Sequence, residues 1–263
     1  MNNSGGKTHS IEPARGAGCS LCRHGGSLDF DFSYAFQPII DVRKARVFAH
    51  EALIRGLGGE PAQTVLERVN PANRYQFDQA CRVRAIETAA RLGLSGKLSI
   101  NFLPNAIYRP EVCISTTLRA AETCGFPIDR IIFETVEGER IEDGKWLAEV
   151  FREYQRIGFL TAIDDFGAGY AGLNLLADFQ PDIIKLDMSL VRSIDKRKTS
   201  HAIVRAVAGI CHELDIQLIA EGVETRDELF CLQDAGVELI QGYLLSMPLF
   251  ESCLHDADLT LPV

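Results

Sequence analysis

Polar and mostly acidic side chains end seven short apolar runs of this sequence. Several carboxylates gathered in one pocket would repel one another strongly unless cations neutralised them. A set made only of Asp, Glu and Asn oxygens suits magnesium, manganese or calcium better than zinc. The residues concerned are Glu51, Asn101, Glu134, Asp164 with Asp165, Lys185 with Asp187, Glu221 and Gln241.

Two adjacent aspartates, Asp164 and Asp165, indicate that such a pocket binds two cations. One aspartate could bridge both ions while its neighbour reaches only the second, and two ions about 3.5–4 Å apart are the usual arrangement for in-line displacement at phosphorus. Lys185 could position or deprotonate the attacking water. Phosphodiester hydrolysis is therefore the predicted chemistry. The alternatives are an ion pair for Lys185 and, for any single carboxylate, a helix cap or a solvated strand end.

Alternating strands and helices would bring these side chains together. Helical periodicity marks residues 76–92, 145–157, 201–214 and 225–235, and such alternation predicts βαβ units with a parallel sheet. Eight strands are the number that closes a (β/α)8 barrel, in which all the carboxyl ends of the strands share one mouth. An open doubly wound sheet is the alternative. The expected strands are residues 34–41, 46–51, 97–101, 130–134, 160–165, 182–187, 216–221 and 237–241.

The first two strands predict a departure from the standard barrel. The link between Ile40 and Arg46 is too short for a crossover helix, so these strands should be antiparallel. The predicted fold is α/β, a modified (β/α)8 TIM-type barrel with one antiparallel strand near its start. Residues 1–29 are polar and Gly-rich and predict a flexible segment, whereas residues 30–263 predict one domain.

Composition excludes some function classes. Apolar residues make up 46% and charged residues 24%, as in ordinary globular proteins, and the net charge of −9 argues against a groove for DNA or RNA. The sequence has neither a secretion signal nor a membrane-spanning run, so we expect a cytoplasmic protein with reduced cysteines. Cys19 and Cys22, with His24 nearby, could bind a metal or report redox state, but a mobile, reduced segment is the simpler interpretation.

Taken in order, these residues resemble the EAL family of cyclic-di-GMP phosphodiesterases. A lone Glu-Ala-Leu triplet would be a weak signal, whereas all the motifs in sequence are specific. Within the family the resemblance is closest to EAL domains that follow blue-light-sensing BLUF domains, although we do not expect such a sensor within these 263 residues. The matching motifs are Gln37-Pro38-Ile39, Glu51-Ala52-Leu53-Ile54-Arg55, Asn101-Phe102-Leu103, Glu134-Thr135-Val136-Glu137, Asp164-Asp165-Phe166-Gly167-Ala168-Gly169-Tyr170, Lys185-Leu186-Asp187, Glu221-Gly222-Val223-Glu224 and Gln241-Gly242-Tyr243.

The resemblance implies a role for each matching residue. Asp164 would bridge the two cations, Lys185 would orient or activate the water, and Glu137 would brace the loop after Asp165 and couple metal binding to dimerisation. Arg55 would contact a substrate phosphate, while Gln37 and Asp78 would contact guanine. The implied catalytic residues are Glu51, Lys185, Glu221, Gln241 and Glu137; the metal ligands are Glu51, Asn101, Glu134, Asp164, Asp165 and Glu221; the substrate contacts are Gln37, Leu53, Arg55, Asp78 and Asp187.

The resemblance also implies hydrolysis of cyclic-di-GMP to linear pGpG with two divalent cations, magnesium or manganese, with calcium inhibitory, in a homodimer. The alternatives are a receptor that holds the dinucleotide without turnover and a scaffold that binds an unidentified regulatory protein. The intact set of ligands favours the enzyme. Two departures leave the ligands in place: Gly56 stands where many relatives carry Trp, and Ala171-Gly172 replaces a common Ser pair.

Overall fold

The structure is a computed structural model that describes residues 28–107, 109–136, 144–168 and 176–262. The predicted flexible segment up to residue 27, the Cys19–Cys22 pair and Glu137 lie outside the described residues. The proposed domain boundary near residue 29 therefore stays a prediction.

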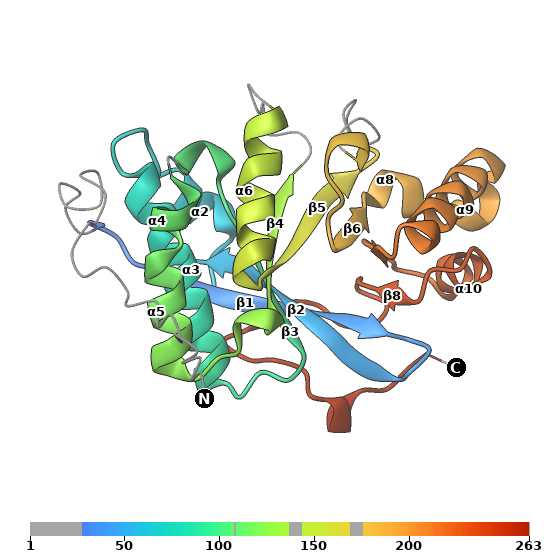
Figure 1. The fold of residues 1–263 in the computed structure, drawn as a ribbon. Coiled ribbons are helices and arrows are strands. Elements are labelled where there is room, and N and C mark those ends of the chain that lie inside the picture. Colours follow the sequence, from blue (N-terminus) through green and yellow to red (C-terminus); the bar gives the residue numbers. More distant parts are fainter. Residues whose placement is uncertain (1–27, 108, 137–143, 169–175, 263) are drawn as a thin grey trace, which may run out of the picture.

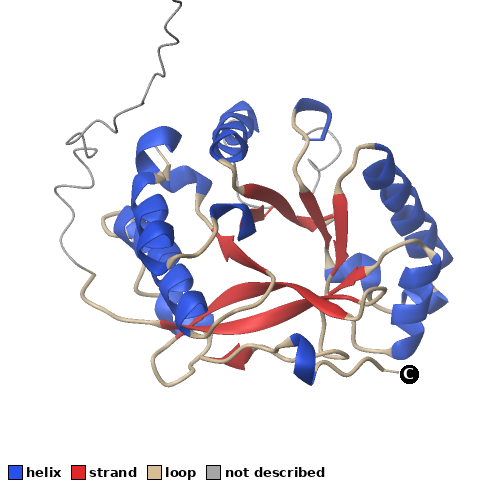
Figure 2. Cartoon of the chain, turned by 60° about the horizontal axis from the view of Figure 1, so that its bottom comes forward, coloured by secondary structure: helices blue, strands red, loops and turns tan. Residues whose placement is uncertain are grey.

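Within the described ranges, eight strands close into a barrel, as predicted (Figures 1 and 2). All neighbouring pairs from β2 to β8 are parallel. The sequence located all eight strands of the barrel, with boundaries that differ by a few residues. The strands are β1 (Ser33–Asp41), β2 (Arg46–Arg55), β3 (Lys97–Asn101), β4 (Ile131–Val136), β5 (Leu160–Phe166), β6 (Ile183–Leu186), β7 (Gln217–Ala220) and β8 (Leu239–Ile240).

Strand β1 is the predicted reversed strand, and it closes the ring. It pairs antiparallel with β2, from Ser33 opposite Arg55 to Asp41 opposite Arg46. On its other edge it pairs antiparallel with β8. A short additional strand, β9 (Leu249–Phe250), also pairs with β1 and lies outside the ring.

Helices surround most of the barrel (Figure 2), whereas the C-terminal segment lies along the side formed by β1 and β2 (Figure 1). The four predicted helices are present as α3, α6, α9 and α10, whereas α2, α4, α5 and α8 were not predicted. No helix in the described ranges is long and apolar enough to cross a membrane. The helices are α2 (Ala62–Leu66), α3 (Arg74–Arg91), α4 (Pro110–Cys113), α5 (Ser115–Cys124), α6 (Gly144–Ile157), α8 (Met188–Val191), α9 (Lys198–Glu213) and α10 (Arg226–Asp234), with short 3-10 turns η1 to η4.

Two stacked layers of side chains belong to the strands of the barrel. The lower layer is a separate apolar cluster that includes Ile39, Ala49, Ile132, Ala162, Ile183, Ile219 and Leu239. Because strand side chains alternate, the residue two positions closer to the mouth faces the same way. The next layer towards the mouth is therefore built from the residues two positions away from the apolar ones, and it is polar. Its members are Gln37, Glu51, Glu134, Asp164, Lys185, Glu221 and Gln241.

A buried histidine attaches the C-terminal segment to β2. The His50 side chain is fully buried, and its Nε2 lies 3.0 Å from the carbonyl oxygen of Leu254. The Nδ1 atom has no hydrogen-bond partner. Burial lowers the pKa of His50 from 6.5 to about 4. The folded protein therefore holds His50 neutral, with Nε2–H donating to Leu254.

We predict that acid destabilises the protein through His50. Above pH 6.5 the side chain is neutral in both states, but as the pH falls towards about 4 only the unfolded state takes up the proton. The contribution of His50 to the free energy of unfolding should fall by about 3 kcal/mol over this interval, at roughly 1.36 kcal/mol per pKa unit. Carboxylates with a raised pKa contribute in the opposite direction. Denaturant titrations of the wild type and of His50→Gln, which keeps a donor for Leu254, therefore measure the loss as the difference between the two profiles; parallel profiles would contradict the assignment.

Candidate active site

The ammonium group of Lys185 lies among four carboxylates at the mouth of the barrel. Its Nζ is 2.7 Å from Oε1 of Glu221, 3.1 Å from both Oε2 of Glu134 and Oδ1 of Asp164, and 3.3 Å from Oε2 of Glu51. The Lys185 side chain is only 1% exposed. Burial alone would lower the pKa of Lys185, but the surrounding carboxylates raise it well above its ordinary value. Lys185 is therefore a charged group in the metal-free protein.

Hydrogen bonds connect the carboxylates of β2 and β4 to their neighbours. Gln241 Nε2 donates to Oε2 of Glu51 at 2.7 Å, and Asn101 Nδ2 donates to Oε1 of Glu134 at 2.8 Å and to Oε1 of Glu51 at 3.3 Å. Ser99 Oγ donates to Oε2 of Glu134 at 2.6 Å. The strand ends predicted to supply the first cation site thus do lie together. Ser99 is a further member that the sequence reasoning did not identify.

Asp164 and Asp165 both reach the mouth because β5 is irregular there. In a regular strand, consecutive side chains point to opposite faces. The register between β5 and β6 shifts between Ile163 and Phe166, and Asp165 adopts a left-handed backbone with φ of 52°. Its amide donates to Oδ1 of Asp164 at 2.9 Å. A strained residue at this position brings two adjacent carboxylates to one site.

Asp164, Asp165 and Glu221 form a group of acidic side chains whose ligand oxygens lie within 4.8 Å of one another. It matches the set predicted for the second cation. Burial, with repulsion from Asp164, raises the pKa of Glu221 to about 8 and that of Asp165 to about 6. Since a metal ligand must be deprotonated, a cation that binds at neutral pH would release a proton from Glu221. Without a cation, these carboxyl groups are hard to ionise. Their oxygen atoms are the type of ligand that a hard divalent cation prefers.

A cleft of about 300 Å³ opens above this group. Gln37 and Asp187, two of the predicted substrate contacts, line it, although the Asp187 side chain also caps α8 by accepting the amide of Ser189 at 3.0 Å. Met188, Arg192 and Tyr243 line it as well, and none of them was predicted. Gln241 contributes a buried Oε1 atom that has no hydrogen-bond partner. This atom is free to accept from a bound ligand.

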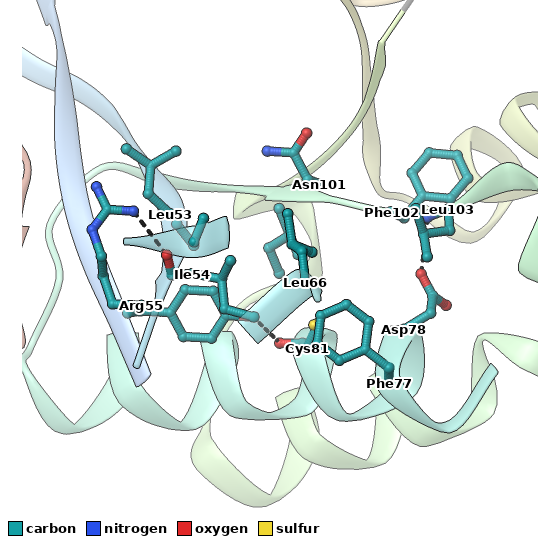
Figure 3. Close-up of a pocket in the computed structure, with 14 residues that line it drawn as sticks. Leu53, Ile54, Arg55, Leu66, Phe77, Asp78, Cys81, Asn101, Phe102 and Leu103 are labelled. Carbon is teal, nitrogen blue, oxygen red and sulfur yellow. Dashed lines mark hydrogen bonds between the residues drawn. The ribbon is translucent and has the colours of Figure 1, made fainter. Parts of the chain in front are cut away.

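An apolar pocket of about 440 Å³ lies beside the cleft, between the ends of β2 and β3 and the helices α2 and α3 (Figure 3). Leu53 and Arg55, both predicted substrate contacts, line it together with Asn101. Figure 3 shows Arg55 and Asp78 at opposite ends of the pocket. The other lining side chains are mainly apolar, including Tyr34, Ile54, Leu66, Phe77 and Phe102.

Asp78 does not join the acidic cluster. Its buried carboxylate pairs with Arg82, where Nη2 and Oδ2 are 2.5 Å apart, and its Oδ1 accepts the amide of Leu103 at 3.0 Å. Arg82 is itself fully buried and lies 3.4 Å from the hydroxyl of Tyr154 on α6. The Asp78 carboxylate thus ties α3 to the end of β3. The i,i+4 spacing of Asp78 and Arg82 on a helix permits this pair, but the sequence prediction did not include it.

Replacing Lys185 by Met should strongly destabilise the metal-free protein. The change leaves buried carboxylates without their counter-charge, and loss of one partner of a buried ion pair costs about 3–5 kcal/mol. Denaturant unfolding in chelator, above pH 8 where Glu221 is ionised, measures the effect. Added manganese should restore part of the stability.

Lys196→Met is the matched control, because the Lys196 side chain is 78% exposed. It should change the free energy of unfolding by no more than about 0.5 kcal/mol. If Lys185→Met were as stable as the wild type in chelator, Lys185 would not be the counter-charge of the cluster.

Comparisons with known proteins agree with this geometry. The EAL domain family model matches residues 27–248. Among curated proteins, the blue light- and temperature-regulated antirepressor BluF of Escherichia coli is 34% identical over 214 residues, which are 81% of this chain and 53% of BluF. The cyclic di-GMP phosphodiesterase PdeR of Escherichia coli is 38% identical over 168 residues, 64% of this chain and 25% of PdeR. The chain thus spans about half the length of these relatives, or less.

Solved structures give the same family. A standalone EAL protein from Vibrio cholerae O395, in its c-di-GMP-bound form, superposes with a TM-score of 0.84 and 54% identity, covering 87% of this chain and 97% of that protein. The manganese and cyclic-di-GMP complex of BlrP1 from Klebsiella pneumoniae gives a TM-score of 0.80 at 37% identity, covering 84% of this chain and 56% of BlrP1. The resemblance seen in the sequence is confirmed, and the chain belongs to the EAL domain family.

Proposed function

We propose that this chain hydrolyses cyclic-di-GMP to linear pGpG with two divalent cations, magnesium or manganese. The observation that carries the proposal is the cluster at the mouth, where Asp164, Asp165 and Glu221 converge beside Lys185. Two relatives give further support: PdeR is named a cyclic di-GMP phosphodiesterase, and the similar Vibrio cholerae protein was solved with c-di-GMP bound.

Six side chains would hold the cations. Glu51, Asn101, Glu134 and Asp164 are proposed for one ion, and Asp164, Asp165 and Glu221 for the other. The cations would polarise the scissile phosphodiester and lower the pKa of the attacking water. For Asn101 the ligand would be the amide oxygen, since its nitrogen already donates to Glu51 and Glu134.

The chain's own groups would orient the water and the substrate. Lys185 Nζ lies between strand-end carboxylates, and when cations bind those carboxylates its N–H groups would donate to the water or to a phosphate oxygen. The free Oε1 of Gln241 can accept a hydrogen bond from the same water while its Nε2 stays on Glu51. Glu137, proposed to brace the loop after Asp165, lies outside the described residues.

The apolar pocket is proposed to take one guanine base. Leu53 would contact the base and Arg55, at the rim, a phosphate. Asp78 lies at the far end of the pocket, and a carboxylate has enough lone pairs to accept a guanine N–H besides its bonds from Arg82 and Leu103. Gln37 and Asp187 would contact the substrate in the neighbouring cleft. The cytoplasmic location expected from the sequence stays a prediction.

A protein-binding function is the second candidate. BluF, one of the similar proteins, is named an antirepressor rather than a phosphodiesterase. A barrel that binds a regulatory protein, or one that holds the dinucleotide without turnover, would keep the fold but would not need a complete acidic cluster. The complete cluster in this chain therefore favours hydrolysis.

The direct test is chromatographic. Purified protein is incubated with cyclic-di-GMP and either magnesium, manganese, calcium or chelator, and the product pGpG is quantified. We expect product with magnesium or manganese, none with chelator, and poor turnover with calcium because of its looser coordination geometry. Glu51→Ala should lower turnover by roughly 100-fold or more, since even partners that only support a ligand contribute about 10–100-fold.

Glu238→Ala is the matched control for Glu51→Ala. Glu238 pairs with Arg43 at the opposite end of the barrel, and its side chain is 43% exposed. It should leave turnover unchanged. Intact cyclic-di-GMP in every metal would remove the hydrolysis proposal, and equilibrium binding on the same samples would then separate a silent receptor from a scaffold.

A homodimer through α9 is also proposed. Ile203, Ile210 and Leu214 form an exposed apolar row on its outer face, spaced so that they share one side of the helix. Exposed apolar rows of this kind are typical of protein interfaces. By analogy with the family, residues 171–179 are a second candidate for the dimer face, and they lie largely outside the described residues.

Light scattering after size-exclusion chromatography tests the dimer. Ile210→Arg places a charge in the centre of the row and should convert a dimer into a monomer. Phe230→Arg changes an exposed apolar residue of α10 instead, outside the row, and should leave the mass unchanged. A monomeric wild type, or a dimeric Ile210→Arg, would contradict the α9 interface.

A further inference from the structure

The buried carboxylate of Glu228 joins two loops that line the cleft. Its Oε1 accepts the amide of Ser193 at 2.8 Å, while its Oε2 accepts the amides of Glu224 at 3.0 Å and Thr225 at 3.1 Å. Ser193 belongs to the loop after β6, and the other two donors belong to the loop after β7. Glu228 itself is only 2% exposed. Burial alone would raise its pKa, but the three amides lower it, so Glu228 is ionised.

Both loops carry residues of the candidate active site. The loop after β6, residues 187–197, contains the short helix α8 and the 3-10 turn η3, and its residues Asp187, Met188 and Arg192 line the cleft. The loop after β7, residues 221–225, begins at Glu221, one of the three clustered acids. A second link, the pair of Arg192 and Glu224 with Nη2 and Oε1 2.7 Å apart, spans the same gap but is partly exposed, so solvent weakens it.

The segment after Glu221 is held closely on its other sides. The amide of Val223 donates to the carbonyl of Gln241 at 3.1 Å, and a Cβ on Gly242 would lie 2.0 Å from the carbonyl oxygen of Val223. A Cβ on Gly222 would lie 2.7 Å from Cβ of Met188. The segment is therefore seated between β8 and the loop after β6. Glu228 fixes the end of the segment opposite to Glu221.

The backbone of Ser193, which donates to Glu228, is strained. Ser193 has φ of 53°, a left-handed backbone that a serine adopts unfavourably. In that conformation its amide points at Glu228. The contact therefore compensates a strained residue, and without it the loop would have reason to relax.

We propose that Glu228 is a positioning residue that holds the two loops together and so fixes Glu221 for cation binding. This rests on the proposed function, in which Glu221 is a metal ligand. The competing interpretation is local: Glu228 is also the third residue of a capping box, in which its amide donates to Oγ1 of Thr225 at 3.2 Å, and it could serve only to begin α10.

Two substitutions separate the link between loops from the helix cap. Glu228→Gln keeps an oxygen for Glu224 and Thr225, as capping boxes allow, but turns an amide NH2 towards the amide of Ser193 and breaks the link. Thr225→Ala does the reverse, since it removes the cap hydroxyl and leaves all three acceptor contacts of Glu228 in place. Glu228→Asp, which keeps the charge but is too short to reach both loops, serves as a second variant if Glu228→Gln does not fold.

The readouts are the manganese dissociation constant by calorimetry, amide exchange at Ser193, and kcat and KM for cyclic-di-GMP, all measured well below the unfolding temperature. We expect Glu228→Gln to bind manganese about 10-fold more weakly, as for loss of a partner that orients a ligand, and to expose the Ser193 amide. Its kcat should fall more than its KM changes. Thr225→Ala should resemble the wild type in every one of these readouts.

Equal manganese affinity in the wild type and Glu228→Gln would overturn the proposal. So would equal losses in Glu228→Gln and Thr225→Ala, because the effect would then follow the helix cap. Manganese binding and amide exchange do not depend on turnover. If the wild type bound manganese but did not hydrolyse cyclic-di-GMP, the proposed function would be wrong. The role of Glu228 would still be tested by the manganese affinities and amide exchange of the variants.

Discussion

The buried ammonium group of Lys185 supplies the counter-charge for the carboxylates at the mouth of the barrel. Four carboxylates lie within 3.3 Å of Lys185 Nζ, and without a counter-charge their desolvation and repulsion would oppose folding. The ammonium carries one charge and compensates the cluster only in part. Burial, together with repulsion from Asp164 and Glu51, still raises the pKa of both Glu134 and Glu221. The metal-free protein can thus fold with this acidic site, and the site still has more negative than positive charge to offer a cation.

The position of Lys185 depends in turn on the two layers beneath it. The apolar layer excludes water from the lower barrel, and the strand period of two places a polar residue above almost every apolar one. Most of the cluster therefore follows from strand registers, whereas Glu221 is the first residue after β7 and depends on the loop that follows it. The cleft above it is different, because its walls are loops that carry Asp187, Met188 and Arg192.

The sequence predicted the strands, the reversed first strand and the gathering of their terminal side chains, because each depends on local periodicity and on barrel closure. It did not predict that β5 is irregular at Asp164 and Asp165, since a register shift depends on the partner strand. It also missed Arg192 and Glu228, whose importance arises from contacts between loops distant along the chain. Asp78 was assigned from resemblance alone, and its ion pair with Arg82 became apparent only with the packing of α3.

The reversed strand determines where the chain joins the barrel. In a barrel of eight parallel strands the polypeptide enters at the bottom, far from the chemistry, but here Ser33 pairs with Arg55 at the mouth and the chain then runs downwards. The residues just before it are anchored at that rim, with the Phe30 and Phe32 rings 6.1 and 5.6 Å from Phe77 on α3, whose side chain lines the apolar pocket. A mechanical pull or twist on the amino-terminal side of Phe30 would therefore act first on the wall of the apolar pocket.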